Sequence, residues 1–143
     1  MPSQLKVGPP AVNLRVPSDV HYFPTGVLLQ PGATYRFVAD KSEWTDAGHP
    51  STAAGNPDPL LAQQVFSGLL RCQEANWFAL IGAVGGSDSQ LFPIGLGCEW
   101  TFEPISEEDE AETPPELQLF ANDAIGFYWS NVGLIGVTIE RIS

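Results

Sequence analysis

The chain has 143 residues, of which 43% are hydrophobic and only 16% are charged, so it can form one domain with a core and lacks the charge-rich composition of a disordered chain. Its 14 glycines and 13 prolines favour many short strands joined by turns over long helices. The formal net charge of -11 argues against binding to nucleic acid or to anionic membrane surfaces, since both carry negative charge.

Much of the acidity lies in one segment. Seven of the 17 acidic residues fall between Glu103 and Glu116, where there is no Lys or Arg. The segment lacks the glycine turn around which calcium loops arrange their ligands. Its prolines and its lack of apolar residues predict a solvated loop, and we place no site there.

The sequence shows no targeting signal. The first 16 residues contain no apolar run long enough for the core of a signal peptide, and glycines interrupt the longest apolar stretches well short of a membrane span. We therefore expect no membrane insertion, and a protein that is cytoplasmic or exported without a conventional signal peptide. Cys72 and Cys98 are too few for a disulfide framework, and we expect both thiols to be reduced.

The first half of the chain predicts strands followed by a long connection. Residues 27–29 and 33–39 predict two strands around a Gln-Pro-Gly turn, and the second alternates with the period of two that a sheet with one covered face requires. Residues 40–59 are rich in Pro, Gly, Ser, Thr and Asp and predict a long loop. Residues 60–70 predict either one short helix or a turn-rich segment.

The second half of the chain predicts further strands. Residues 77–84 form a continuous apolar run, which is typical of a strand buried on both faces, and residues 85–89 predict a turn. Residues 98–103 alternate clearly and predict a half-buried strand. Residues 117–121 and 132–142 complete the set.

These elements predict an all-β fold, a single-domain β-sandwich of the jelly-roll or galactose-binding-like type. Residues 1–19 are expected to form an N-terminal extension, and residues 20–143 the sandwich domain. No internal repeat of fixed period is present.

Common catalytic motifs are absent from the sequence, which has no GxSxG elbow, no HExxH pair, no Walker loop and no dinucleotide fingerprint. The only histidines are His21 and His49. We therefore expect no enzymatic activity, and retain a hydrolase that uses one of these histidines only as an alternative.

The most informative segment is residues 120–133, FANDAIGFYWSNVG. Asp123 precedes Ser130 and Asn131 by seven and eight residues across one glycine-containing loop, so their oxygens can converge. Hard oxygen donors on a loop between strands suit calcium. The alternative is that the Asp and Asn side chains simply cap a turn.

Four patches of sequence carry a resemblance to a known family. They are Gln30-Pro31-Gly32 with Trp44-Thr45-Asp46-Ala47-Gly48, Asn56-Pro57-Asp58, the run from Trp77 to Gly85 with Phe92-Pro93-Ile94-Gly95, and Asn122-Asp123 with Ser130-Asn131-Val132-Gly133. In this order they resemble the LecA-like (PA-I type) calcium-dependent galactophilic lectin family over about residues 27–142. The resemblance implies a small β-sandwich that binds a galactose-type sugar through calcium.

The resemblance also implies a set of site residues. The implied calcium ligands are the side chains of Asp123, Asn131 and Ser130 and the backbone carbonyls of Ala47 and Phe127. The implied sugar contacts are Asp123, Asn131, Asn56, Asp58 and Phe127, and Trp129 joins them as an expected contact because aromatic faces stack on sugars. Ser130 stands where the family has Asn or Asp, and Asn56 where it has His, although His49-Pro50 is an alternative match for that His-Pro pair. The aromatic residues 127–129 either stack on sugar or pack inward.

We therefore expect a carbohydrate-binding, lectin-like domain that recognises a galactoside-like glycan with Ca²⁺ as cofactor and that can form a homo-oligomer. The alternative is a degenerate lectin-fold module for protein–protein interaction, without calcium or sugar. Since the family builds its site from two regions, residues 40–59 are expected to lie beside the loop that carries Asp123.

Overall fold

The computed structural model of the chain describes residues 2–46, 48–57, 64–105 and 114–143. The strands are β1 (Ser3–Gln4), β2 (Val12–Pro17), β3 (Phe23–Leu28), β4 (Thr34–Ala39), β5 (Trp44–Asp46), β6 (His49–Ser51), β7 (Leu80–Val84), β8 (Ser87–Pro93), β9 (Gly97–Thr101), β10 (Glu116–Ala121), β11 (Asn131–Val132) and β12 (Leu134–Arg141). The 3-10 helices η1 (Ser67–Leu69) and η3 (Tyr128–Ser130) lie in connections between strands. Among the described residues, no helix has the length and apolar character needed to cross a membrane.

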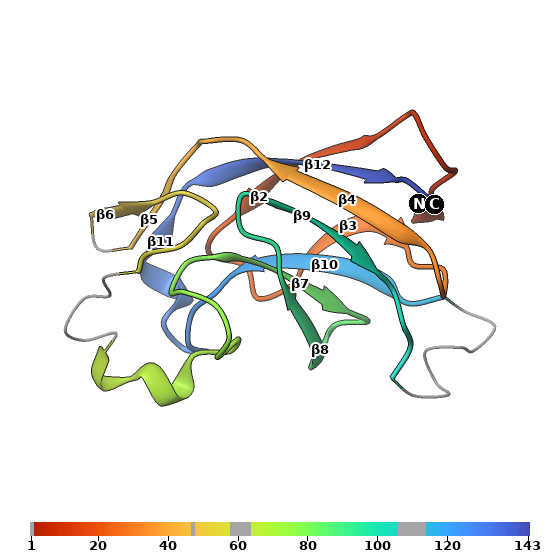
Figure 1. The fold of residues 1–143 in the computed structure, drawn as a ribbon. Coiled ribbons are helices and arrows are strands. Elements are labelled where there is room, and N and C mark those ends of the chain that lie inside the picture. Colours follow the sequence, from red (N-terminus) through yellow and green to blue (C-terminus); the bar gives the residue numbers. More distant parts are fainter. Residues whose placement is uncertain (1, 47, 58–63, 106–113) are drawn as a thin grey trace.

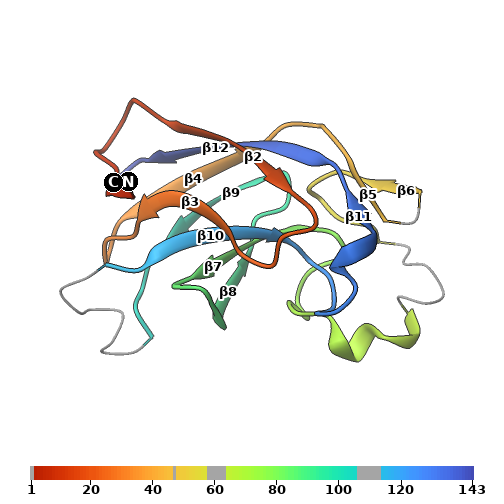
Figure 2. The same cartoon turned by 180° about the vertical axis from the view of Figure 1, so that it is seen from behind.

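Two sheets face each other in the structure. One has the strand order β1-β3-β10-β7-β8 and the other β2-β12-β4-β9, and Figure 1 shows them as two layers. A third, small sheet of order β11-β5-β6 lies at the end opposite to the two chain termini, as Figure 2 shows from behind. The all-β sandwich that the sequence predicts is confirmed.

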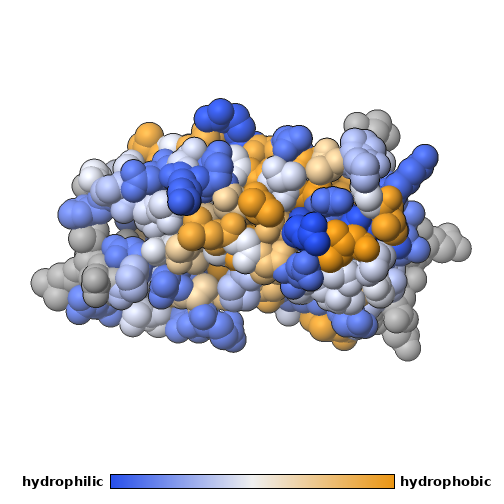
Figure 3. Space-filling view, turned by 45° about the horizontal axis from the view of Figure 1, so that its top comes forward, coloured by the Kyte–Doolittle hydropathy of each residue, from blue (hydrophilic) through white to orange (hydrophobic). Residues whose placement is uncertain are grey.

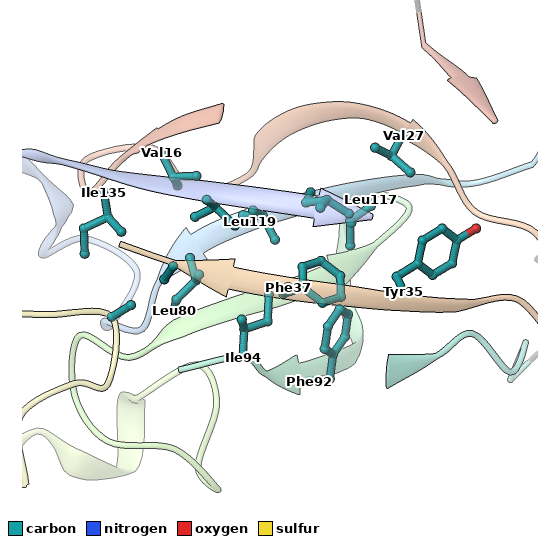
Figure 4. Packing of buried hydrophobic residues seen from close by; sticks show 14 of the residues in the cluster. Val16, Val27, Tyr35, Phe37, Leu80, Phe92, Ile94, Leu117, Leu119 and Ile135 are labelled. Atoms are coloured by element: carbon teal, nitrogen blue, oxygen red, sulfur yellow. The ribbon is translucent and has the colours of Figure 1, made fainter. Parts of the chain in front are cut away.

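Alternating apolar residues fill the space between the two large sheets. In β4, Tyr35, Phe37 and Ala39 are buried while the residues between them face solvent, as the period of two predicts. Across the sandwich, Leu117 and Leu119 of β10 belong to the same core, and Figure 4 shows them in one cluster with Phe37 and Tyr35. The core therefore holds together strands that lie about 80 residues apart in the sequence.

The outer face of the four-stranded sheet is mixed in character. Figure 3 shows hydrophobic side chains lying among hydrophilic ones on this side of the molecule. Arg36 of β4 and Glu99 of β9 form an ion pair there at 3.3 Å, with both side chains about half exposed. Such a pair is typical of a solvated sheet face.

Strand β7 is shorter than the apolar run that predicts it. The sequence predicts a strand over residues 77–84, but the strand begins only at Leu80 because Phe78 has a φ of 65°, which breaks the extended backbone. Burial on both faces is confirmed. Leu80 contacts the core between the sheets, whereas Ile81 packs into a second apolar cluster on the other face of the five-stranded sheet.

The turn after β7 is tighter than expected. The sequence predicts a turn over residues 85–89, but Gly85 and Gly86 alone make it, with φ values of 69° and 71°. Positive φ at both central residues is the geometry of a type I′ hairpin. β8 therefore begins at Ser87 and pairs with β7, although its polar start gives no strand pattern in the sequence.

The first 19 residues supply strands to both large sheets. β2 pairs antiparallel with β12 over six residues, and Val16 is fully buried in the core. β1 pairs in parallel with β3. Residues 12–17 of the expected N-terminal extension thus lie within the four-stranded sheet.

The predicted loop over residues 40–59 is not irregular throughout, because it contains β5 and β6. These strands are only three residues each and pair with one another and with β11, which lies far along the chain. In the uncertain segment 60–70, the described residues include the short helix η1. Of the acidic segment expected to be a solvated loop, residues 106–113 lie outside the described residues.

Candidate metal and carbohydrate site

The predicted site lies on the loop between β10 and β11, at the end of the sandwich away from the termini (Figures 1 and 2). The antiparallel pairing of β5 with β11 brings Asp46 opposite Asn131 and Thr45 opposite Val132. The expectation that residues 40–59 lie beside the Asp123 loop is therefore confirmed for β5. Ala47, an expected calcium ligand through its carbonyl, and Asp58, an expected sugar contact, lie outside the described residues.

Asn122 fixes the start of this loop. Its side chain is fully buried, and its amide oxygen accepts a hydrogen bond of 2.9 Å from the Cys72 backbone N–H. Its amide nitrogen donates to the carbonyls of Cys72 and Asn76 at 2.9 and 3.0 Å. Both the oxygen and the nitrogen of the amide are thus hydrogen-bonded, so Asn122 fixes the backbone that leads into Asp123.

Asp123 is buried without a cationic partner among the described residues. The residue is 1% exposed. Oδ1 accepts a hydrogen bond of 2.7 Å from the Ala124 backbone N–H, and Oδ2 accepts one of 2.9 Å from the Asn131 amide. Burial raises the pKa of the Asp123 carboxyl, and the negative charge of Asp46 also raises it, against the lowering effect of the two hydrogen bonds. A carboxylate in this setting is stabilised by a nearby cation.

Asn131 presents an unpartnered oxygen beside this carboxylate. Its amide nitrogen donates to the Ser18 carbonyl and to Asp123 Oδ2, both at 2.9 Å. Since both neighbours are acceptors, they fix which end of the amide faces them. Oδ1 is then left buried with no hydrogen-bond partner in the described structure. A buried oxygen of this kind costs about 1–3 kcal/mol unless a ligand or ion meets it.

Further oxygens converge from the loop and from β5. The Ser130 hydroxyl donates to Asp46 Oδ1 at 2.7 Å, and the Phe127 carbonyl lies 3.3 Å from the same hydroxyl. The sequence did not indicate Asp46 as a site residue, because it meets Ser130 through a contact between residues 84 positions apart in the chain. The one sequence feature that could have indicated it is its position just before Ala47 in the Trp44–Gly48 patch.

This oxygen set fits calcium. Calcium takes six to eight oxygen ligands from carboxylates, amides, hydroxyls and carbonyls in loose geometry. Among the residues that the structure describes, no three His, Cys, Asp or Glu side chains gather as a metal cluster. A cation here would therefore depend largely on neutral oxygens, and among these Asn131 Oδ1 has no hydrogen-bond partner within the described residues.

The three consecutive aromatic residues do not share one role. Tyr128 points inward and is 3% exposed, whereas Trp129 is 84% exposed. Phe127 packs beside the small buried cluster of Leu70, Trp77 and Ala124. Of the two aromatic residues expected to touch sugar, only Trp129 therefore offers a fully open ring face.

Asn56 reaches the same region through its backbone. Its N–H donates to the Trp77 carbonyl at 2.7 Å, and Trp77 belongs to the cluster that Phe127 contacts. The half-buried Asn56 is thus joined through Trp77 to the cluster beside which Phe127 packs. His49, its alternative in the family match, lies on β6 opposite Asp46.

Arg71 anchors the same loop through further hydrogen bonds. Its side chain is 2% exposed and forms two hydrogen bonds, of 3.1 and 2.8 Å, with the Asp88 carboxylate. The guanidinium also donates to the Tyr128 hydroxyl at 2.8 Å and lies 3.5 Å from the centre of the Phe120 ring. Its backbone N–H donates to the Asp123 carbonyl at 3.1 Å. Arg71 therefore holds two residues of the candidate loop, a role that the sequence alone did not indicate.

Among the comparisons with known proteins, only the one with solved structures found a match, and that match supports the β-sandwich fold. No protein-family model matches the sequence, and no curated protein matches it. Among solved structures, the chain is similar to the EclA N-terminal domain, described as a PllA-like lectin, with a TM-score of 0.61 and 18% sequence identity. The match covers 90% of this chain and 94% of that one. The protein thus has a lectin-like β-sandwich fold.

Proposed function

We propose that the protein binds carbohydrate, a galactose-type sugar, through a calcium ion held by the loop between β10 and β11. The observation that carries the proposal is the buried pair of Asp123 and Asn131, in which an amide oxygen lacks a partner and a carboxylate lacks a counter-ion among the described residues. The lectin-like fold supports the same conclusion.

Asp123 and Asn131 would hold the ion through their side chains, Ser130 through its hydroxyl, and Phe127 and Ala47 through backbone carbonyls. A bound calcium ion supplies open coordination positions that two neighbouring sugar hydroxyls can fill. Asp123 and Asn131 then also accept hydrogen bonds from those hydroxyls. Because three of these residues belong to one loop and Asn131 begins the strand that follows it, binding depends on the hydrogen bonds that keep the loop in place.

Trp129 supports the carbohydrate part of the proposal. Trp129 lies on the helix η3, immediately before Ser130, and is 84% exposed. An open indole offers an apolar face to the C–H groups of a pyranose, while its neighbours offer polar atoms to the hydroxyls. Asn56 and Asp58 are the expected polar contacts outside the loop.

Calorimetric titration with calcium tests the metal part of the proposal, on the wild type and on Asp123→Ala. We expect the wild type to bind calcium and the variant to lose binding, while melting in chelator shows whether each chain is folded. Because Asp123 is buried and accepts two hydrogen bonds, the variant should also melt somewhat lower in chelator, unlike an exposed loop carboxylate. A wild type that gives no heat at millimolar calcium would contradict the proposal.

One observation favours the alternative, an interaction module without calcium or sugar. Large apolar side chains are exposed near the same end of the sandwich: Val65, Phe66, Leu69, Ile125, Trp129 and Val132. Exposed apolar residues of this kind are typical of protein-binding surfaces or of contacts between copies of one chain. Calcium-independent self-association, with no glycan bound, would favour this function over the first.

A further inference from the structure

The strand β5 places a second carboxylate at the candidate site. Asp46 is directly opposite Asn131 in the antiparallel pairing of β5 and β11. Residues directly opposite one another in such a pair project to the same face of the sheet. Asp46 and the unpartnered Asn131 oxygen therefore belong to one face of the small sheet.

A hydrogen bond joins Asp46 to the loop, since its Oδ1 accepts one of 2.7 Å from the Ser130 hydroxyl. The negative charge of Asp46 also raises the pKa of the Asp123 carboxyl. The hydroxyl has a single proton, which goes to Asp46, so its lone pairs stay free for another partner. Oδ2 of Asp46 accepts no hydrogen bond from the described residues.

No cationic side chain balances these two carboxylates within the described part of the chain. The ion pairs found there join Arg36 to Glu99 and Glu140, and Arg71 to Asp88. Two like charges in one half-buried site repel one another, more strongly where water is scarce. A divalent cation removes this repulsion and satisfies the Asn131 oxygen at the same time.

We propose that Asp46 is itself a ligand of the metal, acting together with Ser130. This inference rests on the proposed calcium site and deepens it. Ser130 alone offers only a neutral oxygen, and the carboxylate to which it donates supplies the second negative charge. The site then has two carboxylates, Asp46 from β5 and Asp123 from the loop. A bound ion would link the small sheet β11-β5-β6 to the loop. Since affinity for calcium follows the charge and number of ligands, Asp46 is expected to contribute strongly to binding.

Three variants separate ligation from other effects. Asp46→Asn keeps the shape and removes the charge, Asp46→Ala removes the ligand, and Glu43→Gln removes one charge from an exposed position three residues away. Calcium affinity is measured by calorimetry. Terbium(III), a calcium-sized luminescent ion, reports the number of metal-bound waters through its decay rates in H₂O and D₂O.

We expect Asp46→Asn to weaken calcium binding on the order of tenfold or more, and Glu43→Gln to change it less than about twofold. Asp46→Ala should gain at least one terbium-bound water relative to the wild type, because water replaces a lost ligand. In chelator, Asp46→Asn should melt no lower than the wild type, since it removes one of two repelling charges.

Each contrary result has a distinct meaning. If the Asp46 variants bind calcium as the wild type does, or lose affinity with no change in bound water, Asp46 is not a ligand although the calcium site stands. If Asp46→Asn unfolds in chelator, the residue is structural and the inference is overturned. If the wild type binds neither calcium nor terbium, both this inference and the proposed function fail.

Discussion

Replacing Arg71 by Met removes a guanidinium that is 2% exposed and leaves an apolar chain of similar length in its place. The change breaks two hydrogen bonds to Asp88, one to the Tyr128 hydroxyl and one to the His21 carbonyl. It also removes the cation from the face of the Phe120 ring, 3.5 Å from the ring centre.

The expected loss of stability is large. Removing one partner of a buried ion pair costs about 3–5 kcal/mol, because the other charge stays behind without its partner. The Asp88 side chain is 34% exposed and regains water, so we expect the lower end, about 3 kcal/mol. For a domain of this size, this loss lowers the melting temperature by roughly 10 °C.

Urea unfolding of the wild type and of Arg71→Met measures the difference. Arg36→Met is the matched control, because Arg36 pairs with Glu99 on the surface and their side chains are 48% and 57% exposed. Such exposed pairs contribute at most about 1 kcal/mol. If Arg71→Met costs no more than Arg36→Met, the buried guanidinium adds nothing net to stability, and the reasoning is wrong.

Three further predictions concern other parts of the fold. Gly82→Ala should destabilise by about 1–3 kcal/mol in urea unfolding, since an added Cβ would lie 2.2 Å from the Phe92 ring; an unchanged midpoint would contradict this packing. Burial raises the pKa of Asp88, but its hydrogen bonds outweigh this effect and lower the pKa below its usual value. The stability that Asp88 contributes is therefore present above about pH 4 and is lost as the pH falls through the lower pKa of the folded state. In Asp88→Asn, the free energy of unfolding should fall less steeply as the pH is lowered. Thiol titration of the denatured protein without reductant should find two free thiols, and in the native protein the buried Cys72 should react more slowly than Cys98; finding none would show a disulfide.

The sandwich was predictable because its central strands carry a local signal. Tyr35, Phe37 and Ala39 alternate with outward residues, and this pattern follows directly from one covered sheet face. β8 was not predictable, since Ser87 and its neighbours are polar and their pairing depends on the glycine turn before them. The three-residue strand β5 is too short for any periodic pattern and pairs with a strand far along the chain.

The site was predictable only in part, for a similar reason. Asp123 and Ser130 lie on one loop and Asn131 begins the next strand, so their spacing in the sequence indicates that their oxygens can converge. Asp46 joins them through a strand pairing that no local pattern encodes. Spacing also cannot show which way a side chain points, and the structure separates the inward Tyr128 from the exposed Trp129.

Binding to a glycan array, with calcium and with chelator, tests the central claim most directly. The proposed function predicts binding of the wild type to galactose-terminated glycans in calcium and its loss in chelator. Asp123→Ala, shown to be folded by its melting curve, should not bind under either condition. Binding that persists unchanged in chelator, or no glycan bound at any calcium concentration, would contradict calcium-assisted carbohydrate recognition.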